Sequence, residues 1–389
     1  MKILFMEWKS LGQADIVQEF SSRGWRVDFF HFPREKENTR LNNALCEQIV
    51  RTIAGSGYDF VFSFNYFPVI SIACNACRVK YVSWTFDSPF IQLYSNTIGY
   101  PYNYAFIFDR GTCEDLWEKG IRTVFYLPMA APVARYDSYR PNGQEYDIYR
   151  TDISFIGSTY EEKKNRFYER LSGIPEESKG YLDGLIQSQK LIYGDFILER
   201  LLTPDILEDM MNICPLAVNR DGFERLEWVY ANYFLARRVT ALERKSVLNM
   251  LSQKYEVNLY TYEDTPDLLK VRNRGTAEVF REAPLIYQCS KVNLNISLRS
   301  ILTGIPLRAF EIMGSGGFLV SNYQEDFLEF FKPNEDFICY MSIEELMNKV
   351  EYYLIHEKER TEIAENGYRK VKMSHTYKER VDSILEKIT

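Results

Sequence analysis

The segment 303–311 carries residue types that suit a phosphate ester. Its opening loop contains Gly304 and Pro306 and precedes a predicted helix, and proline suits the first turn of a helix because its missing N–H is no loss there. The free backbone N–H groups at such a helix N-terminus form an anion site, and Arg308 adds a guanidinium that can bind phosphate oxygens through two donors. Glu311, one turn into the helix, can accept hydrogen bonds from two neighbouring hydroxyls. The segment therefore predicts a site for a diphosphate and a ribose.

A purely structural interpretation of Arg308 and Glu311 is equally open from residue types alone. An acid near the start of a helix complements the helix dipole. Arg308 would then pair with a surface acid rather than with a phosphate.

Further candidates lie outside this segment. Asp87, in Ser83-Trp-Thr-Phe-Asp87-Ser-Pro89, directly follows a predicted buried strand; its carboxylate could orient an acceptor hydroxyl or act as its base, although Asp before Ser-Pro is also a common turn. Gly12 follows the first predicted strand and would let the backbone approach a ligand. Tyr262, at the end of a later predicted strand, could lie beside a nucleobase or simply pack.

Cysteine and histidine are sparse. The seven cysteines are scattered along the chain and odd in number, which predicts reduced thiols. Cys74-Asn-Ala-Cys77 is a single pair, whereas a structural zinc site needs four ligands. The three histidines, His31, His356 and His375, are far apart in sequence. We expect no metal site and no bound cofactor.

Length and charge restrict the class of protein. A chain of 389 residues suits two α/β domains of roughly 150–200 residues each. The net charge of −7 argues against nucleic acid as the main partner, because phosphate backbones require a basic surface. The first residues do not resemble a signal peptide, and the sequence has no apolar run of about 18 residues. We expect no transmembrane segment and a cytoplasmic location. The 28 Tyr and 26 Phe suit sugar rings as well as core packing.

Short apolar runs alternate with amphipathic stretches in the first part of the chain. Predicted strands cover Lys2–Met6, Trp25–Phe32, Tyr58–Phe64, Val79–Trp84, Tyr104–Asp109 and Thr123–Leu127, and predicted helices include Ala14–Ser21 and Leu41–Ala54. This order predicts βαβ units and a doubly wound parallel sheet. Ligands bind at the carboxyl ends of the strands of such a sheet, so the loops after Met6, Phe64, Trp84 and Asp109 should share one edge.

The second part repeats the alternation after a polar, turn-rich stretch at 132–147, which we interpret as a linker. A strand at Asp152–Gly157 and a helix at Tyr160–Leu171 should follow, and residues 175–252 are helical in pattern and look like an insertion. The remaining expected strands are Glu256–Tyr262, Val292–Ile296 and Phe318–Ser321, with amphipathic helices at Ile343–Leu354 and Tyr377–Ile388. The expected domains are 1–140, 150–376 and a terminal helix at 377–389.

Pro284 to about Lys378 resembles the C-terminal domain of the glycosyltransferase group 1 superfamily, and more closely its spore-maturation, CgeB-like branch. The segments that carry the resemblance are Tyr287–Ser297, Gly304–Glu311, Gly316–Asn322, Ser342–Leu346, Ile363–Gly367 and His375–Tyr377. Asp152–Arg166 is similar to the opening strand and helix of that family's second domain. The resemblance covers about a quarter of the chain strongly.

The resemblance implies a GT-B fold, in which two Rossmann-like domains face each other across a cleft and the final helix crosses back to the first domain. It implies a metal-independent glycosyltransferase of polysaccharide or glycoprotein biosynthesis. The donor would be a nucleoside-diphosphate sugar, UDP-linked, the acceptor a carbohydrate or protein hydroxyl, and the reaction retaining. Candidate catalytic residues are Asp87, Arg308 and Glu311. Candidate donor-binding residues are Gly12, Gly157, Ser158, Tyr262, Arg299, Thr303, Gly304, Ile305, Pro306, Leu307, Arg308 and Glu311.

The sequence departs from the group 1 pattern in two places. Group 1 enzymes carry two glutamates in the pattern E-x7-E; Glu311 matches the second, but Thr303 occupies the first position, which normally contacts the donor sugar. The usual Arg/Lys pair for the diphosphate is also missing after Gly157-Ser158, so Arg308, Arg299 and the helix N-terminus are the candidates for that positive charge.

Three other functions stay open from the sequence. An inverting transferase would use Asp87 as a true base, and a nucleotide-sugar-binding scaffold would have no catalysis at all. A bilobal solute-binding protein is a third and more distant alternative, since it would need an export signal. An oligomer is compatible with each of them.

Overall fold

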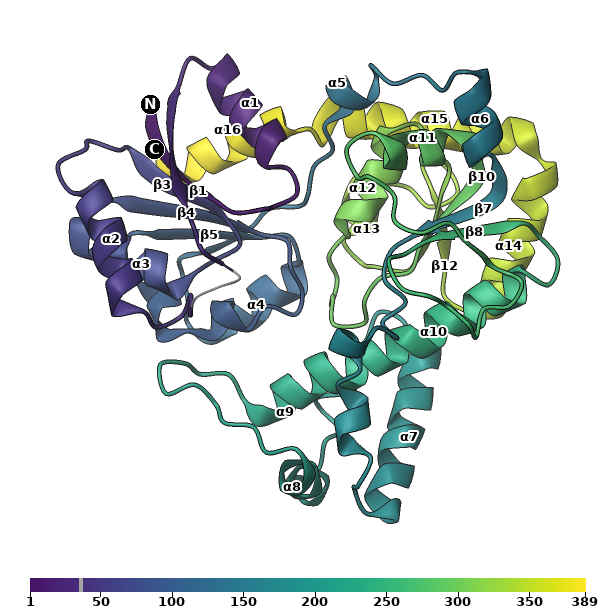
Figure 1. Ribbon diagram of the computed structural model, residues 1–389, viewed down its shortest axis with the longest axis horizontal. Coiled ribbons are helices and arrows are strands. Elements are labelled where there is room, and N and C mark those ends of the chain that lie inside the picture. The colour runs from purple at the N-terminus through teal and green to yellow at the C-terminus, as the bar shows by residue number, and fades with distance from the viewer. Residues whose placement is uncertain (35–37) are drawn as a thin grey trace. The chain divides into compact units, whose positions relative to one another are not determined.

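The computed structural model describes residues 1–34 and 38–389. The chain forms two compact units, and each contains a six-stranded, wholly parallel sheet with flanking helices (Figure 1). The predicted α/β class with two doubly wound sheets is confirmed. The first unit comprises Met1–Met129, Ala217–Arg225 and Tyr377–Thr389, and the second comprises Ala130–Leu216 and Leu226–Thr376. The change of unit after Met129 comes about ten residues earlier than the boundary expected at 140.

The sheet of the first unit has the strand order β2-β1-β3-β4-β5-β6. Its strands are β1 (Lys2–Glu7), β2 (Arg26–His31), β3 (Phe60–Phe64), β4 (Lys80–Thr85), β5 (Asn103–Ile107) and β6 (Val124–Tyr126). Its helices are α1 (Gln13–Ser22), α2 (Asn43–Ile53), α3 (Pro68–Cys77), α4 (Arg110–Glu118) and α16 (Tyr377–Ile388), with 3-10 turns at Ile91–Tyr94 and Asn96–Gly99. The order along the sheet reverses between β1 and β3, which is where ligands bind in such folds.

Aromatic side chains build the core of this unit. Every residue of β3, Phe-Val-Phe-Ser-Phe, is buried, as expected of a central strand covered on both faces. The rings of Phe5 and Phe62 lie 5.4 Å apart, and those of Phe20 and Phe62 lie 5.5 Å apart. Much of the aromatic content of the chain therefore serves packing rather than ligand binding.

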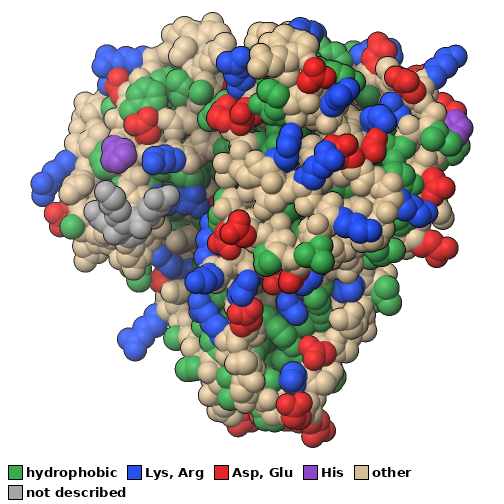
Figure 2. Space-filling model, turned by 45° about the vertical axis from the view of Figure 1, so that its right-hand side comes forward, with side chains coloured by type: hydrophobic (Ala, Val, Ile, Leu, Met, Phe, Trp, Pro, Cys, Tyr) green, Lys and Arg blue, Asp and Glu red, His purple; other side chains and the backbone are tan. Residues whose placement is uncertain are grey.

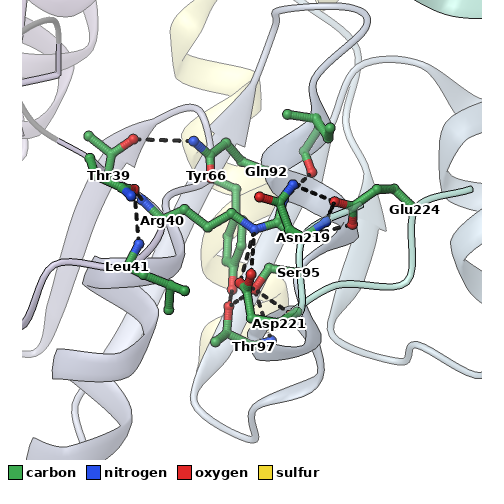
Figure 3. A network of polar contacts seen from close by, with 12 residues as sticks. Thr39, Arg40, Leu41, Tyr66, Gln92, Ser95, Thr97, Asn219, Asp221 and Glu224 are labelled. Atoms are coloured by element: carbon green, nitrogen blue, oxygen red, sulfur yellow. Dashed lines mark hydrogen bonds and ion pairs between the residues drawn. The ribbon is translucent and has the colours of Figure 1, made fainter. Parts of the chain in front are cut away.

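Residues 217–225, which lie in sequence between the helices of the predicted insertion, pack on the first unit (Figure 3). The buried guanidinium of Arg40 bonds Asp221 through Nε at 2.9 Å and Glu224 through Nη2 at 3.1 Å. The backbone N–H of Asn96 donates to the carbonyl of Asp221 at 2.8 Å. Gly222 is required between them, because a Cβ there would collide with both Arg40 and Glu224.

The terminal helix α16 also belongs to the first unit, where it packs on α1 (Figure 1). Gly12 makes this packing possible. It has a left-handed φ of +80°, and a Cβ at this position would collide with the hydroxyl of Tyr377. We expected Gly12 to let the backbone approach a ligand, but the side chain of Tyr377 occupies the position that a Cβ of residue 12 would take.

The sheet of the second unit has the order β12-β11-β10-β7-β8-β9. Its strands are β7 (Thr151–Ile156), β8 (Val257–Tyr260), β9 (Arg272–Asn273), β10 (Ser290–Asn295), β11 (Leu319–Asn322) and β12 (Ile338–Tyr340). Helices that follow or flank them are α5 (Val133–Tyr136), α6 (Gly143–Tyr149), α11 (Glu282–Cys289), α12 (Leu307–Gly314), α13 (Phe327–Phe330), α14 (Ile343–Ile355) and α15 (Glu357–Ser374). The order reverses between β7 and β10.

The helical insertion predicted at 175–252 forms α7 (Glu176–Leu191), α8 (Pro204–Ile213), α9 (Leu226–Val229), a π-helix (Tyr230–Leu235) and α10 (Ala236–Leu251). It has a separate apolar core that includes Leu182, Leu198 and Met210. In Figure 1, α7, α8 and α9 project from the second unit, while α10 runs along its sheet.

Two local predictions were wrong. The helix expected at Tyr160–Leu171 is instead a loop with 3-10 turns at Lys163–Asn165 and Tyr168–Leu171, because the carboxylate of Glu162 organises the backbone there. The stretch 132–147, expected to be an irregular linker, contains α5 and most of α6. Asn142 and Glu145 form a capping box that starts α6.

All seven cysteines are free thiols. Within residues 1–34 and 38–389, no group of three or more His, Cys, Asp or Glu side chains is placed to hold a metal ion. No helix in these same ranges is both long and apolar enough to cross a membrane. Lys and Arg side chains are interspersed with Asp and Glu over the face shown in Figure 2.

Candidate functional site

The carboxyl ends of β7 and β10 are neighbours in the second sheet, at the point where its strand order reverses. The loop after β7 begins with Gly157 and Ser158, and the loop after β10 leads through Arg299 and Thr303 into α12. Backbone and side chains from both loops are therefore available at the same edge. This is the place at which a doubly wound sheet binds its ligand.

Helix α12 begins at Leu307, with Pro306 as its N-cap residue, and no side chain caps its first turn. Gly304 is buried, and the side chain of Ile305 is fully buried. The carbonyl of Thr303 accepts the backbone N–H of Asp326 at 3.0 Å. The loop 303–307 is thus held rigidly, and it can offer a ligand backbone N–H groups rather than side chains such as that of Ile305.

Glu311 and Arg308 form an ion pair within α12. Nη1 of Arg308 lies 2.8 Å from Oε2 of Glu311 and also donates to the hydroxyl of Tyr287 at 2.5 Å. The Glu311 side chain is only 8% exposed, and that of Arg308 is 25% exposed. Burial opposes the charge of Arg308, but Tyr287 and Glu311 outweigh it and raise its pKa. Arg308 was expected to bind phosphate; in the structure its guanidinium positions Glu311.

The loop after β7 is organised around the buried carboxylate of Glu162. Oγ of Ser158 donates to this carboxylate at 2.7 Å, the backbone N–H of Thr159 at 3.0 Å and Nδ2 of Asn165 at 2.9 Å. Burial alone would raise the pKa of Glu162, but the hydrogen bonds from Asn165 and Ser158 lower it below its usual value. Ser158 was a candidate donor ligand, and its hydroxyl is already engaged inside the loop.

Arg299, a candidate donor-binding residue, is engaged in contacts within the second unit. Its Nε pairs with Glu243 at 2.8 Å, and its Nη1 donates to the carbonyl of Ile192 at 3.1 Å. The guanidinium also stacks on the ring of Tyr193, 3.9 Å from its centre. Both members of the ion pair are buried. Arg299 therefore fastens the loop after β10 to the helical insertion, and its charge is already neutralised.

Tyr262 lies beyond the carboxyl end of β8 and is 47% exposed. Nζ of Lys164, from the loop after β7, lies 4.7 Å from the centre of its ring. An exposed ring at this edge can still stack on a base, but one of its faces is covered by the lysine.

In the first unit, Asp87 lies just past the carboxyl end of β4, and Asn65 directly follows the neighbouring β3. Oδ2 of Asp87 accepts Nη2 of Arg34 at 2.6 Å and Nδ2 of Asn65 at 2.8 Å. The guanidinium of Arg34 lies 4.0 Å from the ring centre of Trp8. About a third of the Asp87 and Arg34 side chains is exposed, so this carboxylate is both held in position and accessible.

The sequence analysis did not identify two residues that lie at these sheet edges. Asn65 is fully buried and has a left-handed φ of +58°, a conformation that asparagine tolerates better than most residues. An asparagine directly after a predicted buried strand was the available signal. Arg244, from α10, donates to the carbonyls of Ser158 and Ile296 and so joins the two loops; nothing in its local sequence marks it.

Comparisons with known proteins agree with this architecture. Residues 241–386, which include α12 and Glu311, match the family model described as glycosyl transferase-like. No curated protein matches the sequence.

Solved structures of the same architecture cover nearly the whole chain. HepE of Anabaena, solved with UDP and glucose, is 12% identical, with a TM-score of 0.57 over 100% of this chain and 99% of its own. Sucrose-phosphate synthase of Thermosynechococcus elongatus is 9% identical, with a TM-score of 0.56 over 99% and 98%. A glycosyltransferase of Rickettsia africae is 10% identical, with a TM-score of 0.51 over 100% and 97%. The chain therefore has the GT-B fold, and residues 241–386 are similar to the glycosyl transferase-like family.

Proposed function

We propose that this protein is a glycosyltransferase that moves a sugar from a UDP-sugar to a hydroxyl of a carbohydrate or protein acceptor. The observation that carries the proposal is Glu311, buried in the first turns of α12 beside the strand reversal between β7 and β10. This helix lies inside the segment that matches the glycosyl transferase-like family. The GT-B structure of HepE holds UDP and glucose, which supports a uridine nucleotide as the donor.

Each part of the second unit has a role in this proposal. The backbone N–H groups of Ile305 and Leu307 and the positive end of α12 receive the diphosphate. The carboxylate of Glu311, oriented by Arg308, accepts the ribose hydroxyls. As the bond between the sugar carbon and the diphosphate breaks, negative charge grows on the diphosphate. Donors that are already oriented stabilise that charge without reorganisation.

The acceptor side of the proposal rests on Asp87. Arg34 and Asn65 hold its carboxylate, which would accept a hydrogen bond from the attacking hydroxyl. We propose transfer with retention of anomeric configuration, on the resemblance to group 1 enzymes. The alternative is inversion with Asp87 as general base, and NMR of the product's anomeric proton separates the two.

Binding experiments test the donor site directly. UDP and 2′,3′-dideoxyuridine diphosphate are titrated against the wild type and Glu311→Gln by calorimetry. If Glu311 binds the ribose, the wild type prefers UDP by roughly tenfold or more, since hydrogen bonds to a charged group contribute about 1.5–3 kcal/mol, and Glu311→Gln loses the preference. An equal preference in both proteins would show that Glu311 does not contact the ribose.

Turnover distinguishes an enzyme from a binding module. Incubation with a panel of UDP-sugars and mixed glycan or peptide acceptors should release UDP and yield a glycosylated product. If UDP binds tightly but no UDP-sugar is consumed with any acceptor, the protein is a nucleotide-sugar-binding scaffold instead.

A further inference from the structure

The expected cations for a diphosphate are engaged elsewhere in the second unit. Arg299 is neutralised by Glu243, and Arg308 is paired with Glu311. The loop after β7 also has its own ion pairs, since Arg238 contacts Glu161 at 3.3 Å and Arg166 contacts Glu169 at 3.5 Å. The other basic residues of this loop, Lys163, Lys164 and Arg170, are exposed to solvent. A shielded cation at this edge would bind a diphosphate more strongly than they can, because water screens their charges.

Arg237, the second residue of α10, has a different environment. Its Nη1 donates to the neutral amide oxygen of Asn165 at 3.1 Å, and its Nε is shielded from solvent without a hydrogen-bond partner. The guanidinium lies 4.8 Å from the ring centre of Phe167 and 5.2 Å from that of Tyr233. Across the described part of the chain, no carboxylate lies within ion-pair distance of Arg237. It is a cation in an aromatic setting whose charge is not compensated.

Physical chemistry makes this environment costly without an anion. Leaving a shielded donor without a partner destabilises the folded protein, and removing a cation from water destabilises it further unless the cation is paired. Burial lowers the pKa of Arg237, and the groups that oppose this shift are the side chains of Tyr160 and Tyr233 rather than a carboxylate. An anionic oxygen reaching the guanidinium would remove both costs.

The face of α10 that carries Arg237 lies against both loops of the candidate site. Arg244, two turns further along the helix, bonds the carbonyls of Ser158 and Ile296. Oγ1 of Thr240, between them, accepts the backbone N–H of Arg299 at 3.0 Å. These positions are three, four and seven residues apart, so they share one side of the helix. Arg237 is therefore directed to the same edge of the sheet, at the loop after β7.

We propose that Arg237 binds the diphosphate of the donor and supplies a shielded guanidinium, from α10, beside the loop after β7. Asn165 orients its guanidinium, and because Asn165 also donates to Glu162 at 2.9 Å, the position of Arg237 is coupled to that loop. The helical insertion then contributes to donor binding through α10. This inference rests on the proposed function, and it adds a ligand-binding residue outside the segment that precedes α12.

The test compares three ligands on the full-length protein: UDP, uridine and inorganic pyrophosphate. Arg237→Gln should weaken binding of UDP and pyrophosphate by roughly 10- to 100-fold, as expected for charge-assisted hydrogen bonds, and should leave uridine binding unchanged. Arg238→Gln is the matched control, because it removes a neighbouring arginine that already has an acidic partner; its affinities should equal those of the wild type. Arg237→Lys keeps the positive charge but not the planar guanidinium, so its affinities for UDP and pyrophosphate should lie between those of the wild type and Arg237→Gln.

The alternative role for Arg237 is structural, as a cation stacked between Phe167 and Tyr233. In that case Arg237→Gln lowers the melting temperature while the ratio of UDP to uridine affinity stays at its wild-type value, and the proposal is wrong. If Arg237→Gln does not fold, unchanged pyrophosphate and UDP affinities in Arg237→Lys would overturn it equally. Failure of the proposed donor site gives a different result, since the wild type itself would then bind neither UDP nor uridine. Failure of catalysis alone shows only in the turnover assay and leaves these affinities as they are.

Discussion

The side-chain amide of Asn65 holds Asp87 from two directions. Its Nδ2 donates to Oδ2 of Asp87 at 2.8 Å, while its Oδ1 accepts the backbone N–H of Asp87 at 3.3 Å. Oδ1 also accepts the N–H of Phe86 at 3.1 Å. One buried residue in a left-handed conformation thus fixes both the main chain and the carboxylate of the candidate acceptor residue.

The first prediction concerns Asn65 as a positioning residue. Asn65→Gly keeps the left-handed backbone but removes the amide. The rate of transfer should fall by roughly 10- to 100-fold, because a hydrogen bond to a charged group contributes about 1.5–3 kcal/mol. UDP affinity and the KM for the donor should stay unchanged. Asn65→Asp replaces the donor beside Asp87 with a second negative charge and should lower transfer at least as much as Asn65→Gly. Equal losses in donor binding and turnover would mean that Asn65 only supports the fold.

A second prediction concerns the contact between Gly12 and Tyr377. Gly12→Ala must accept both an unfavourable left-handed φ and a collision with the Tyr377 hydroxyl, so it should lower the free energy of unfolding by about 1–3 kcal/mol. Pairing it with Tyr377→Leu should recover the part due to the collision but not the part due to φ. Urea denaturation of the wild type, the two single variants and the double variant separates the cost of the collision from the cost of the backbone conformation. If the effects of the two substitutions on the free energy of unfolding are strictly additive, the Tyr377 ring does not fill this space.

The third prediction concerns the buried pair of Arg299 and Glu243. Replacing either partner leaves a buried charge without compensation, which typically costs 3–5 kcal/mol. Arg299→Met should therefore destabilise the protein strongly, and Arg299→Met with Glu243→Met should restore much of the stability. UDP affinity of the folded double variant should match that of the wild type. A loss of UDP binding in the stable double variant would show that Arg299 takes part in donor binding.

A fourth prediction follows from Cys289, whose thiol pKa is raised by burial from 9.0 to about 11. Between pH 9 and 11 the unfolded thiol loses its proton while the folded thiol keeps it, so the unfolded state binds fewer protons and stability falls as pH rises. The free energy of unfolding should drop by roughly 1–2 kcal/mol from this group over that range. Comparing wild type with Cys289→Ala by urea denaturation at pH 8 and 10.5 measures it; parallel losses in the two proteins would contradict the assignment.

The fifth prediction concerns metal removal. If helix α12 and arginine side chains supply the positive charge at the diphosphate, transfer should be unchanged after dialysis against EDTA. Activity that disappears with EDTA and returns with Mg²⁺ or Mn²⁺ would show that a cation takes part, and the proposed mechanism would be wrong.

The sequence by itself determined the two parallel sheets and the place of Glu311. Buried strands such as Phe60–Phe64 are short and apolar except for one serine, and helices such as Ile343–Ile355 have one apolar face. Local sequence patterns therefore specify both. The Gly304–Glu311 motif is also local, because a proline, a helix start and a carboxylate one turn later are set by adjacent residues. These features needed no knowledge of distant contacts.

Only the tertiary structure decided which charges are available at the site. Arg299 is neutralised by Glu243, 56 residues away in sequence, whereas Arg237 meets a neutral amide at Asn165, 72 residues away. Both are simply arginines in the sequence. The difference depends on which side chains the packed helix α10 brings to the carboxyl ends of β7 and β10. An arginine's role is set by the dielectric and the partners around it, and those exist only after the chain has folded.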